Sequence, residues 1–265
     1  TLRARLAELS PEDARSLGIA LSRPRFVVRG RNGFAPEGLR ALADVFDLVL
    51  DGYAELFGLV NFTKLPGKKL RLVAHLEPQI TAPPHFAPEP PWHSEIDFPL
   101  VDAAKFSSPT ADGKMLLYGL CHELGHVLAM WGDPRTEEDH HAWAHYTGLA
   151  LVDHLAREHA SEPALKDAHD VRWRSLELER KTLAESKTKA GVKDKDAVLA
   201  LFAALHELVG PKTIGEALAA LDAANECQRV NRVRYFRFEA FERALLATKA
   251  GKRERKAIEL LFAGK

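Results

Sequence analysis

Two histidines stand four residues apart in the stretch LYGLCHELGHVLAMWGD, and a glutamate directly follows the first of them: they are His122, Glu123 and His126. Residues four apart lie on one face of a helix, so both imidazoles can bind one metal ion. Neutral imidazole suits Zn²⁺, and Glu123, one step round the helix, can reach a water bound to that ion. This H-E-x-x-H pattern predicts hydrolysis by a metal-activated water, with Glu123 as general base.

A catalytic zinc site needs a third protein ligand and one open position. The candidates lie in the next predicted helix, 136–155, which follows a short turn and can therefore return antiparallel toward the metal. His141 continues the apolar, inward-facing stripe of that helix, and we predict that it is the third ligand. The alternatives are Glu138, Asp139 and His145. Candidates that do not bind the metal are expected to hydrogen-bond the ligand histidines.

The elements that must position these residues can be read from periodicity and breaker residues. The helix with the two histidines is predicted to begin at a cap on Asp112 and to stop at Gly132 and Pro134. From about residue 113 onward the pattern is almost wholly helical, and it includes one long amphipathic helix from Ile214 to Ala247. Breaks in this half are predicted at 131–136, at the charged stretch 185–196 and at 209–213.

The N-terminal half mixes strand and helix signals. Segments 23–30 and 69–76 are predicted strands, and between them 36–58 has helical spacing, with a proline near its start and a glycine at its end. This order suggests an α/β sheet layer. The proline-rich stretch 77–92 is predicted to be an ordered loop or lid. Segment 94–100 alternates like a strand, and its proline predicts an edge position.

The histidine motif, followed by HHAWAHY at 140–146, resembles the zincin superfamily of zinc metallopeptidases, in its gluzincin branch. That branch takes its third ligand, usually glutamate, from a following helix, often in an Asn-Glu-Gly-Phe-Ala-x-Tyr-like context. His141 stands where that glutamate would be, which is a departure from the family pattern. The metzincin pattern is not met, because Ala129 and Gly132 stand where its glycine and third histidine would be. The resemblance covers about residues 94–155.

The resemblance implies an α+β, zincin-like fold. Residues 1–132 would form an N-terminal lobe with a small mixed sheet plus helices, ending in the histidine-bearing helix. Residues 133–265 would form a mostly α-helical lobe, with the cleft between the two. Segment 94–100 would be the cleft's edge strand, able to pair with an extended peptide.

By the same resemblance, the activity would be peptide-bond hydrolysis with one Zn²⁺ per chain. His122, His126 and His141 would hold the metal, and Glu123 would be the general base. Such an enzyme also needs a hydrogen-bond donor for the oxyanion. The sequence offers Tyr146, Tyr235, His145 and several arginines for that role.

Two other interpretations stay open. Glu123 to His126 and Glu138 to His141 are both Glu-x-x-His pairs, as in two-iron helical bundles, although here they would lie on consecutive helices rather than on the helices such bundles use. Alternatively, a zincin fold can serve as a binding or regulatory protein whose metal is structural. Four protein ligands would indicate that case.

Composition narrows the partners. The chain has 37 basic and 37 acidic side chains and a formal net charge of zero, which does not predict nucleic acid or an anionic membrane as partner. There is no apolar run long enough to span a membrane, and no signal peptide is recognised in a sequence that begins with Thr1. Cys121 and Cys227 are expected to be buried thiols, and the alternative is one disulfide between them. By the resemblance given above, the expected partner is a peptide or protein substrate.

Overall fold

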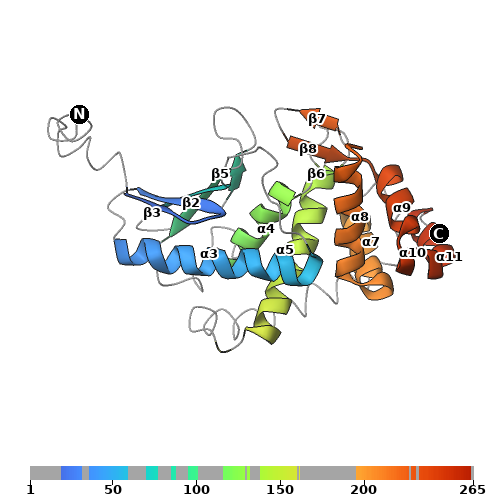
Figure 1. Ribbon diagram of the computed structural model, residues 1–265, viewed down its shortest axis with the longest axis horizontal. Helices are drawn as coiled ribbons and strands as arrows, with labels where there is room; N and C mark the ends of the chain where they lie inside the picture. Colours follow the sequence, from blue (N-terminus) through green and yellow to red (C-terminus); the bar gives the residue numbers. More distant parts are fainter. Residues whose placement is uncertain are drawn as a thin grey trace.

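The computed structural model describes residues 19–31, 36–58, 70–76, 85–87, 95–100, 116–128, 130–131, 138–159, 161, 195–226, 228–230 and 233–263. A mixed sheet with one long helix against it forms the N-terminal half, and helices form most of the rest (Figure 1). The predicted α+β class is therefore correct. The division into two lobes at residue 132 stays a prediction.

The sheet has five strands in the order β1-β2-β3-β5-β4. Their bounds are β1 Ile19–Ser22, β2 Phe26–Arg31, β3 Leu70–Leu76, β4 His85–Ala87 and β5 Glu95–Leu100. The three central strands β2, β3 and β5 run parallel, and the two outer strands run antiparallel to their neighbours. Two of these strands match the predicted segments 23–30 and 69–76, and the prediction of a mixed sheet is confirmed.

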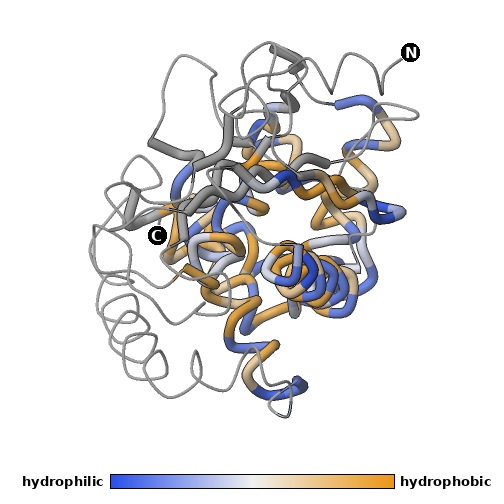
Figure 2. The backbone as a smooth tube through the Cα atoms, turned by 90° about the vertical axis from the view of Figure 1, so that its left-hand side faces the viewer, coloured by the Kyte–Doolittle hydropathy of each residue, from blue (hydrophilic) through white to orange (hydrophobic). Residues whose placement is uncertain are grey.

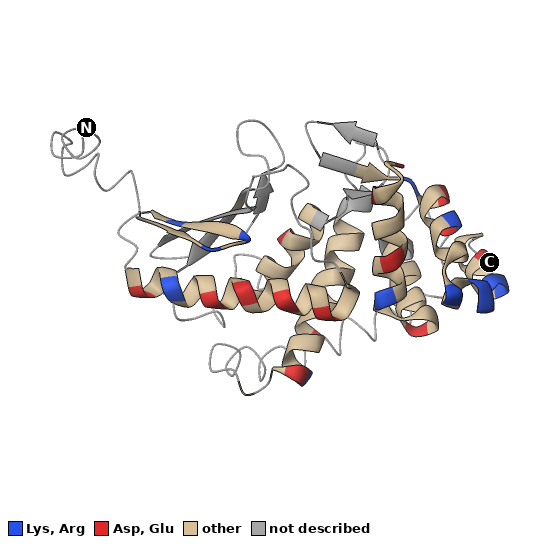
Figure 3. Cartoon of the chain, viewed as in Figure 1, with Lys and Arg blue, Asp and Glu red and all other residues tan. Residues whose placement is uncertain are grey.

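Helix α3, Pro36–Phe57, connects β2 to β3 and packs against the sheet, as the strand–helix–strand order predicted. Phe46 on its inner face meets Phe26 of β2 edge-on, with ring centroids 4.6 Å apart. Its outer side carries acidic residues (Figure 3), three of which pair with arginines just before β2. The helix ends where predicted, because Gly58 has a φ of 69° that only glycine adopts at little cost.

The edge of the sheet differs from the prediction. Strand β5 is not an edge strand, since it lies between β3 and β4, and β4 falls inside the stretch 77–92 that was expected to be a loop. Strand β4 pairs only with residues 95 to 97 of β5, so Pro99 lies beyond that ladder and removes no hydrogen bond from it. Among the described strands, the outermost one on the β5 side of the sheet, where a further strand could pair, is β4.

Two central helices follow the sheet: α4, Leu116–Leu128, and α5, Glu138–Glu158. Helix α4 packs against β4, β5 and α5, while α5 also packs against α3 and α7. Almost every described side chain of α4 is buried. The short strand β6, Met130–Trp131, comes directly after α4. The predicted helix ends at Asp112, Gly132 and Pro134 lie outside the described residues.

The C-terminal part consists of α7 Lys195–Val209, α8 Pro211–Ala223, β7 Gln228–Val230, β8 Val233–Phe236, α9 Phe238–Ala247, α10 Lys249–Arg253 and α11 Arg255–Phe262. The break predicted at 209–213 is confirmed: Gly210, with a φ of 82°, separates α7 from α8, and Pro211 begins the new helix. Helices α7, α8 and α9 to α11 stand together at one end of the molecule (Figure 1).

The single long helix predicted from Ile214 to Ala247 is wrong. Helix α8 ends at Ala223, Asn225 adopts a left-handed φ of 56°, and the chain then enters the β7–β8 hairpin. Strand β8 also pairs in parallel with β6, which makes a second, three-stranded sheet. Apolar residues at 230, 233 and 236 have helical spacing, and tertiary pairing with β6 overrides it.

The apolar core runs without interruption from the sheet through α3, α4, α5 and α7 to α9. The hydropathy view shows apolar segments of the described helices turned toward one another (Figure 2). In the described part of the chain, no single helix is long and apolar enough to cross a membrane. Val198–Val209 and Pro211–Ala223 pass such a test only as a pair, bent by 110°.

Candidate metal centre

Small residues let α4 and α5 cross at very short range. A Cβ added to Gly125 of α4 would lie 2.9 Å from the Cα of Ala144 and closer still to the hydroxyl of Thr147. One added to Gly148 of α5 would lie 3.2 Å from the backbone nitrogen of His122. Any larger side chain at these two glycines would push the helices apart. The crossing therefore sets how near α5 comes to the histidines of α4.

Two buried aromatic residues hold the backbone of α4 from neighbouring helices. The Tyr53 hydroxyl of α3 donates to the carbonyl of Cys121 at 2.7 Å, and Trp143 Nε1 of α5 donates to the carbonyl of Gly125 at 3.0 Å. Each carbonyl belongs to the residue immediately before a candidate ligand. Burial raises the pKa of Tyr53 well above its ordinary value, so its hydroxyl keeps its proton and remains a donor.

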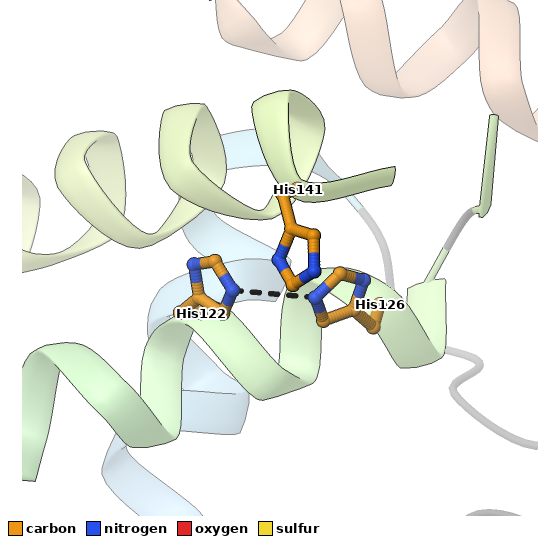
Figure 4. A group of neighbouring side chains, drawn as sticks. All are labelled: His122, His126 and His141. Atoms are coloured by element: carbon orange, nitrogen blue, oxygen red, sulfur yellow. Dashed lines mark hydrogen bonds between the residues drawn. The ribbon is translucent and has the colours of Figure 1, made fainter. Parts of the chain in front are cut away.

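His122, His126 and His141 converge, two from α4 and one from the first turn of α5 (Figure 4). One ligand nitrogen of each lies within 4.8 Å of one ligand nitrogen of both others. Ring centroids are 4.9 Å apart for His122 and His126, 5.7 Å for His122 and His141, and 5.1 Å for His126 and His141. The two α4 histidines are buried, whereas His141 is exposed. The group is thus built into the core but open on one side.

The spacing fits a zinc ion. Zn–N bonds of about 2.0–2.1 Å in a tetrahedral site place two ligand nitrogens roughly 3.3 Å apart. The Nε2 atoms of His122 and His126 are 3.2 Å apart, a separation that one N–H···N hydrogen bond or a shared cation accounts for. Three imidazoles are a donor set that zinc favours, and they leave one position of a tetrahedron for another ligand.

Glu123 lies where a proton acceptor beside the metal would be needed. It is 7% exposed, and its Oε1 is 3.9 Å from His122 Nε2. That distance is too long for a hydrogen bond and leaves the carboxylate beside the ligand group rather than in it. The three ligands that the sequence predicts come together in the structure, and the predicted base adjoins them.

The alternative third ligands are placed differently. His145 lies one turn further along α5, where its Nδ1 is in hydrogen-bond contact with the Tyr118 hydroxyl and its ring meets that of His122 edge-on at 4.7 Å. The group of converging ligand atoms contains His141 as its α5 histidine and does not contain His145. The side chains of Glu138 and Asp139 lie outside the part of the chain that the structure describes.

The candidate oxyanion donors also separate. Tyr146 is buried, and its hydroxyl is 3.0 Å from His206 Nδ1 of α7. This contact lies within the core and directs the hydroxyl to α7 rather than to the three converging histidines. Tyr235 of β8 pairs with Met130, only four residues after His126. Burial raises the pKa of Tyr235, so its hydroxyl is a proton donor at neutral pH.

Two residues that shape this centre were not recognised in the sequence. Tyr53 and Trp143 are anchors for α4, and nothing local distinguishes them from ordinary core aromatics. Trp143 follows His141 by two residues, so its place beside the motif was the only available signal. Cys121, expected to be buried, is a buried thiol. Cys227 lies outside the described residues.

No protein-family model matches the chain, and a search of curated proteins finds no similar sequence.

Proposed function

We propose that the protein is a zinc-dependent peptidase with a zincin-like arrangement of sheet and helices. The observation that carries the proposal is the buried carboxylate of Glu123 beside three converging imidazoles, one of which reaches solvent. Such a group suits hydrolysis because three protein ligands leave a coordination position for water. A purely structural site would need a fourth protein ligand.

His122, His126 and His141 would hold the zinc. When bound, the ion supplies Lewis acidity, which makes water reactive at neutral pH and polarises a carbonyl. Glu123 accepts the proton of the attacking water and delivers it to the amide nitrogen that leaves. Its burial keeps the carboxylate next to the reacting atoms without bulk water around it. Tyr235 is the candidate donor to the carbonyl oxygen, since it is protonated and lies beside the end of α4.

The sheet offers a place for an extended substrate. Helix α4 packs against β4 and β5, and β4 is the outermost described strand on that side of the sheet. A peptide that pairs along the outer edge of β4 would lie beside the helix that carries Glu123. Main-chain hydrogen bonds would hold such a peptide with little dependence on its sequence.

Replacing Glu123 with glutamine tests the proposal. The amide keeps the size of the side chain and cannot accept the proton, so peptide cleavage is expected to fall about 10²- to 10⁴-fold. Zinc content should not change, because Glu123 is not a ligand. Cleavage of a diverse library of fluorogenic peptides measures the activity, and metal analysis measures the zinc content.

The matched control is Glu207→Gln. Glu207 stands in LHELVG at 205 to 210, a near-copy of the motif on α7 that lacks the second histidine, and its side chain is exposed. This variant should cleave peptides as well as the native chain. If the native chain holds zinc and cleaves no peptide in the library, the protein is not a peptidase, and a structural or regulatory metal replaces the proposal.

A further inference from the structure

The last turns of α3 and α5 bring a second set of metal-binding side chains together. Glu55 of α3 lies beside His154 of α5 and His159, which directly follows that helix. His154 is roughly 20 Å further along the helix axis than His141, at 1.5 Å per residue. This group is therefore separate from the histidines of α4.

The contacts converge on one carboxylate oxygen. His154 Nε2 lies 3.0 Å and His159 Nε2 lies 3.1 Å from the same atom, Glu55 Oε2. One ligand atom of each residue lies within 4.8 Å of one ligand atom of both others. In a tetrahedral zinc site, ligand atoms are roughly 3.3 Å apart. The two nitrogen–oxygen distances are already close to that value, and side-chain rotations that bring the two imidazole nitrogens to the same separation would convert the hydrogen-bonded group into a metal site.

We propose that Glu55, His154 and His159 form a second binding site for a divalent transition-metal ion of the zinc type. Two imidazoles and one carboxylate are a donor set that zinc accepts. The side chain of Glu55 is 48% exposed, while those of His154 and His159 are 13% and 23% exposed. The ion would therefore enter from solvent, and water would complete its coordination.

The helices that carry the group are held rigidly beneath it. Gly52, one turn before Glu55, lets α3 approach α5 so closely that an added Cβ would lie 2.8 Å from Leu151 and 2.9 Å from Leu155. Gly215 of α8 lies directly against the backbone carbonyl of Phe57, at the end of α3. A site whose supporting backbone is already fixed loses little conformational entropy when it binds an ion.

A bound ion would join the end of α3 to the end of α5. His159 directly follows α5 and is tied to it by a backbone hydrogen bond, in which its backbone N–H donates to the carbonyl of Leu155. Ligation of His154 and His159 together would therefore prevent that helix end from fraying. The proposal is a second, stabilising metal site, and it does not depend on whether the α4 histidines support peptide cleavage.

Zinc binding to a full-length chain without an affinity tag tests the site. In a His122→Ala, His126→Ala background, isothermal titration with zinc chloride should still detect binding. Adding His159→Ala or Glu55→Gln to that background should weaken the binding at least about tenfold, since even residues that only support metal ligands have effects of that size. The thermal midpoint of the background chain should rise with zinc concentration, and this rise should vanish in both variants.

Glu158→Gln is the matched control, because Glu158 is an exposed carboxylate in the same turn and outside the group. It should bind zinc as the background chain does. Circular dichroism checks that each variant is folded. If the background is unfolded, the same comparison is made in the native chain, where Glu55→Gln should lose one equivalent of zinc. If zinc binding is equal with and without Glu55 and His159, the proposal is overturned, and the two histidines only hydrogen-bond Glu55.

Discussion

At the scale of single residues, the pairing of the two α4 histidines was predictable, and the third histidine of the group was less so. Spacing along one helix fixes the relation of His122 to His126, whatever the rest of the fold does. His141 was chosen because it continues an inward stripe, and the structure puts it with the other two. His145 lies on the same stripe, so the sequence pattern alone does not distinguish it from His141 as a candidate ligand. Only the crossing of α4 and α5 separates them.

The role of His141 is tested by His141→Ala. Because this change removes one of three converging imidazoles, zinc affinity is expected to fall at least about tenfold, as it does even for weaker disruptions of metal sites. Competition with a fluorescent chelator measures the affinity. The control is His145→Ala, which should retain most of the zinc affinity. Undiminished affinity in His141→Ala would remove that residue from the ligand set and make Asp139 the next candidate.

At the scale of elements, helices and strands with one strong local signal were predicted well. The helix that begins at Pro36 ends at a glycine that the sequence shows, Gly58, and the break between α7 and α8 is likewise set by the local residues Gly210 and Pro211. The β7–β8 hairpin was missed because its strands depend on β6, which lies about a hundred residues earlier. Likewise, β4 is a strand because β5 pairs with it, although the prolines on both sides of β4 favoured a loop.

At the crossing of α4 and α5, the expected change in unfolding free energy for a glycine-to-alanine substitution has the opposite sign to that expected from helix propensity. Alanine at an interior helix position usually gains about 0.5–1 kcal/mol over glycine. Gly125→Ala should instead lose about 1–3 kcal/mol of unfolding free energy, because its methyl group would overlap Thr147 and Ala144. Urea denaturation measures the change. Zinc affinity should fall with it, since the helices that carry the ligands are forced apart. A stabilised Gly125→Ala variant would show that the helices separate freely.

At the scale of the whole molecule, composition and the order of patterns indicated an α+β protein with a mixed sheet, and the structure has both. The packing of distant elements could not be predicted in this way. Residues of one contiguous core, such as Phe57, Trp143 and Phe202, are far apart in sequence and meet as rings 4.9 to 6.2 Å apart. A single sequence carries no signal for such contacts, nor for the meeting of Glu55 with His154.

The stability of the whole chain should depend on pH through Glu242. Burial, followed by the charges of Glu259 and Glu239, raises the pKa of this carboxyl in the folded chain. A raised pKa means that folding is favoured while Glu242 is protonated. This contribution is present below the ordinary pKa of about 4.3 and is lost as pH rises through the folded value.

Glu242→Gln should therefore stabilise the protein at pH 7. The gain should be only about a few tenths of a kcal/mol, because solvent screens the charge of this half-buried group. The gain should vanish below about pH 4, where native Glu242 is protonated in both states. Urea denaturation at several pH values measures it, with the exposed Glu216→Gln of α8 as control. A gain that is independent of pH would show that the charge of Glu242, whether through burial or through repulsion, is not its cause.

The two aromatic hydrogen bonds to α4 have a consequence for how fast metal can be loaded. Tyr53 and Trp143 hold the carbonyls before His122 and His126 through two buried side-chain hydrogen bonds, and neither bond involves a metal ligand. Small zinc modules fold only when the ion arrives, and their metal uptake is limited by folding. In this chain the contiguous apolar core and these two hydrogen bonds are expected to hold α4 by themselves. If the proposed site binds zinc, uptake should therefore proceed at the rate of ion encounter, and protein treated with a chelator should take up zinc without refolding.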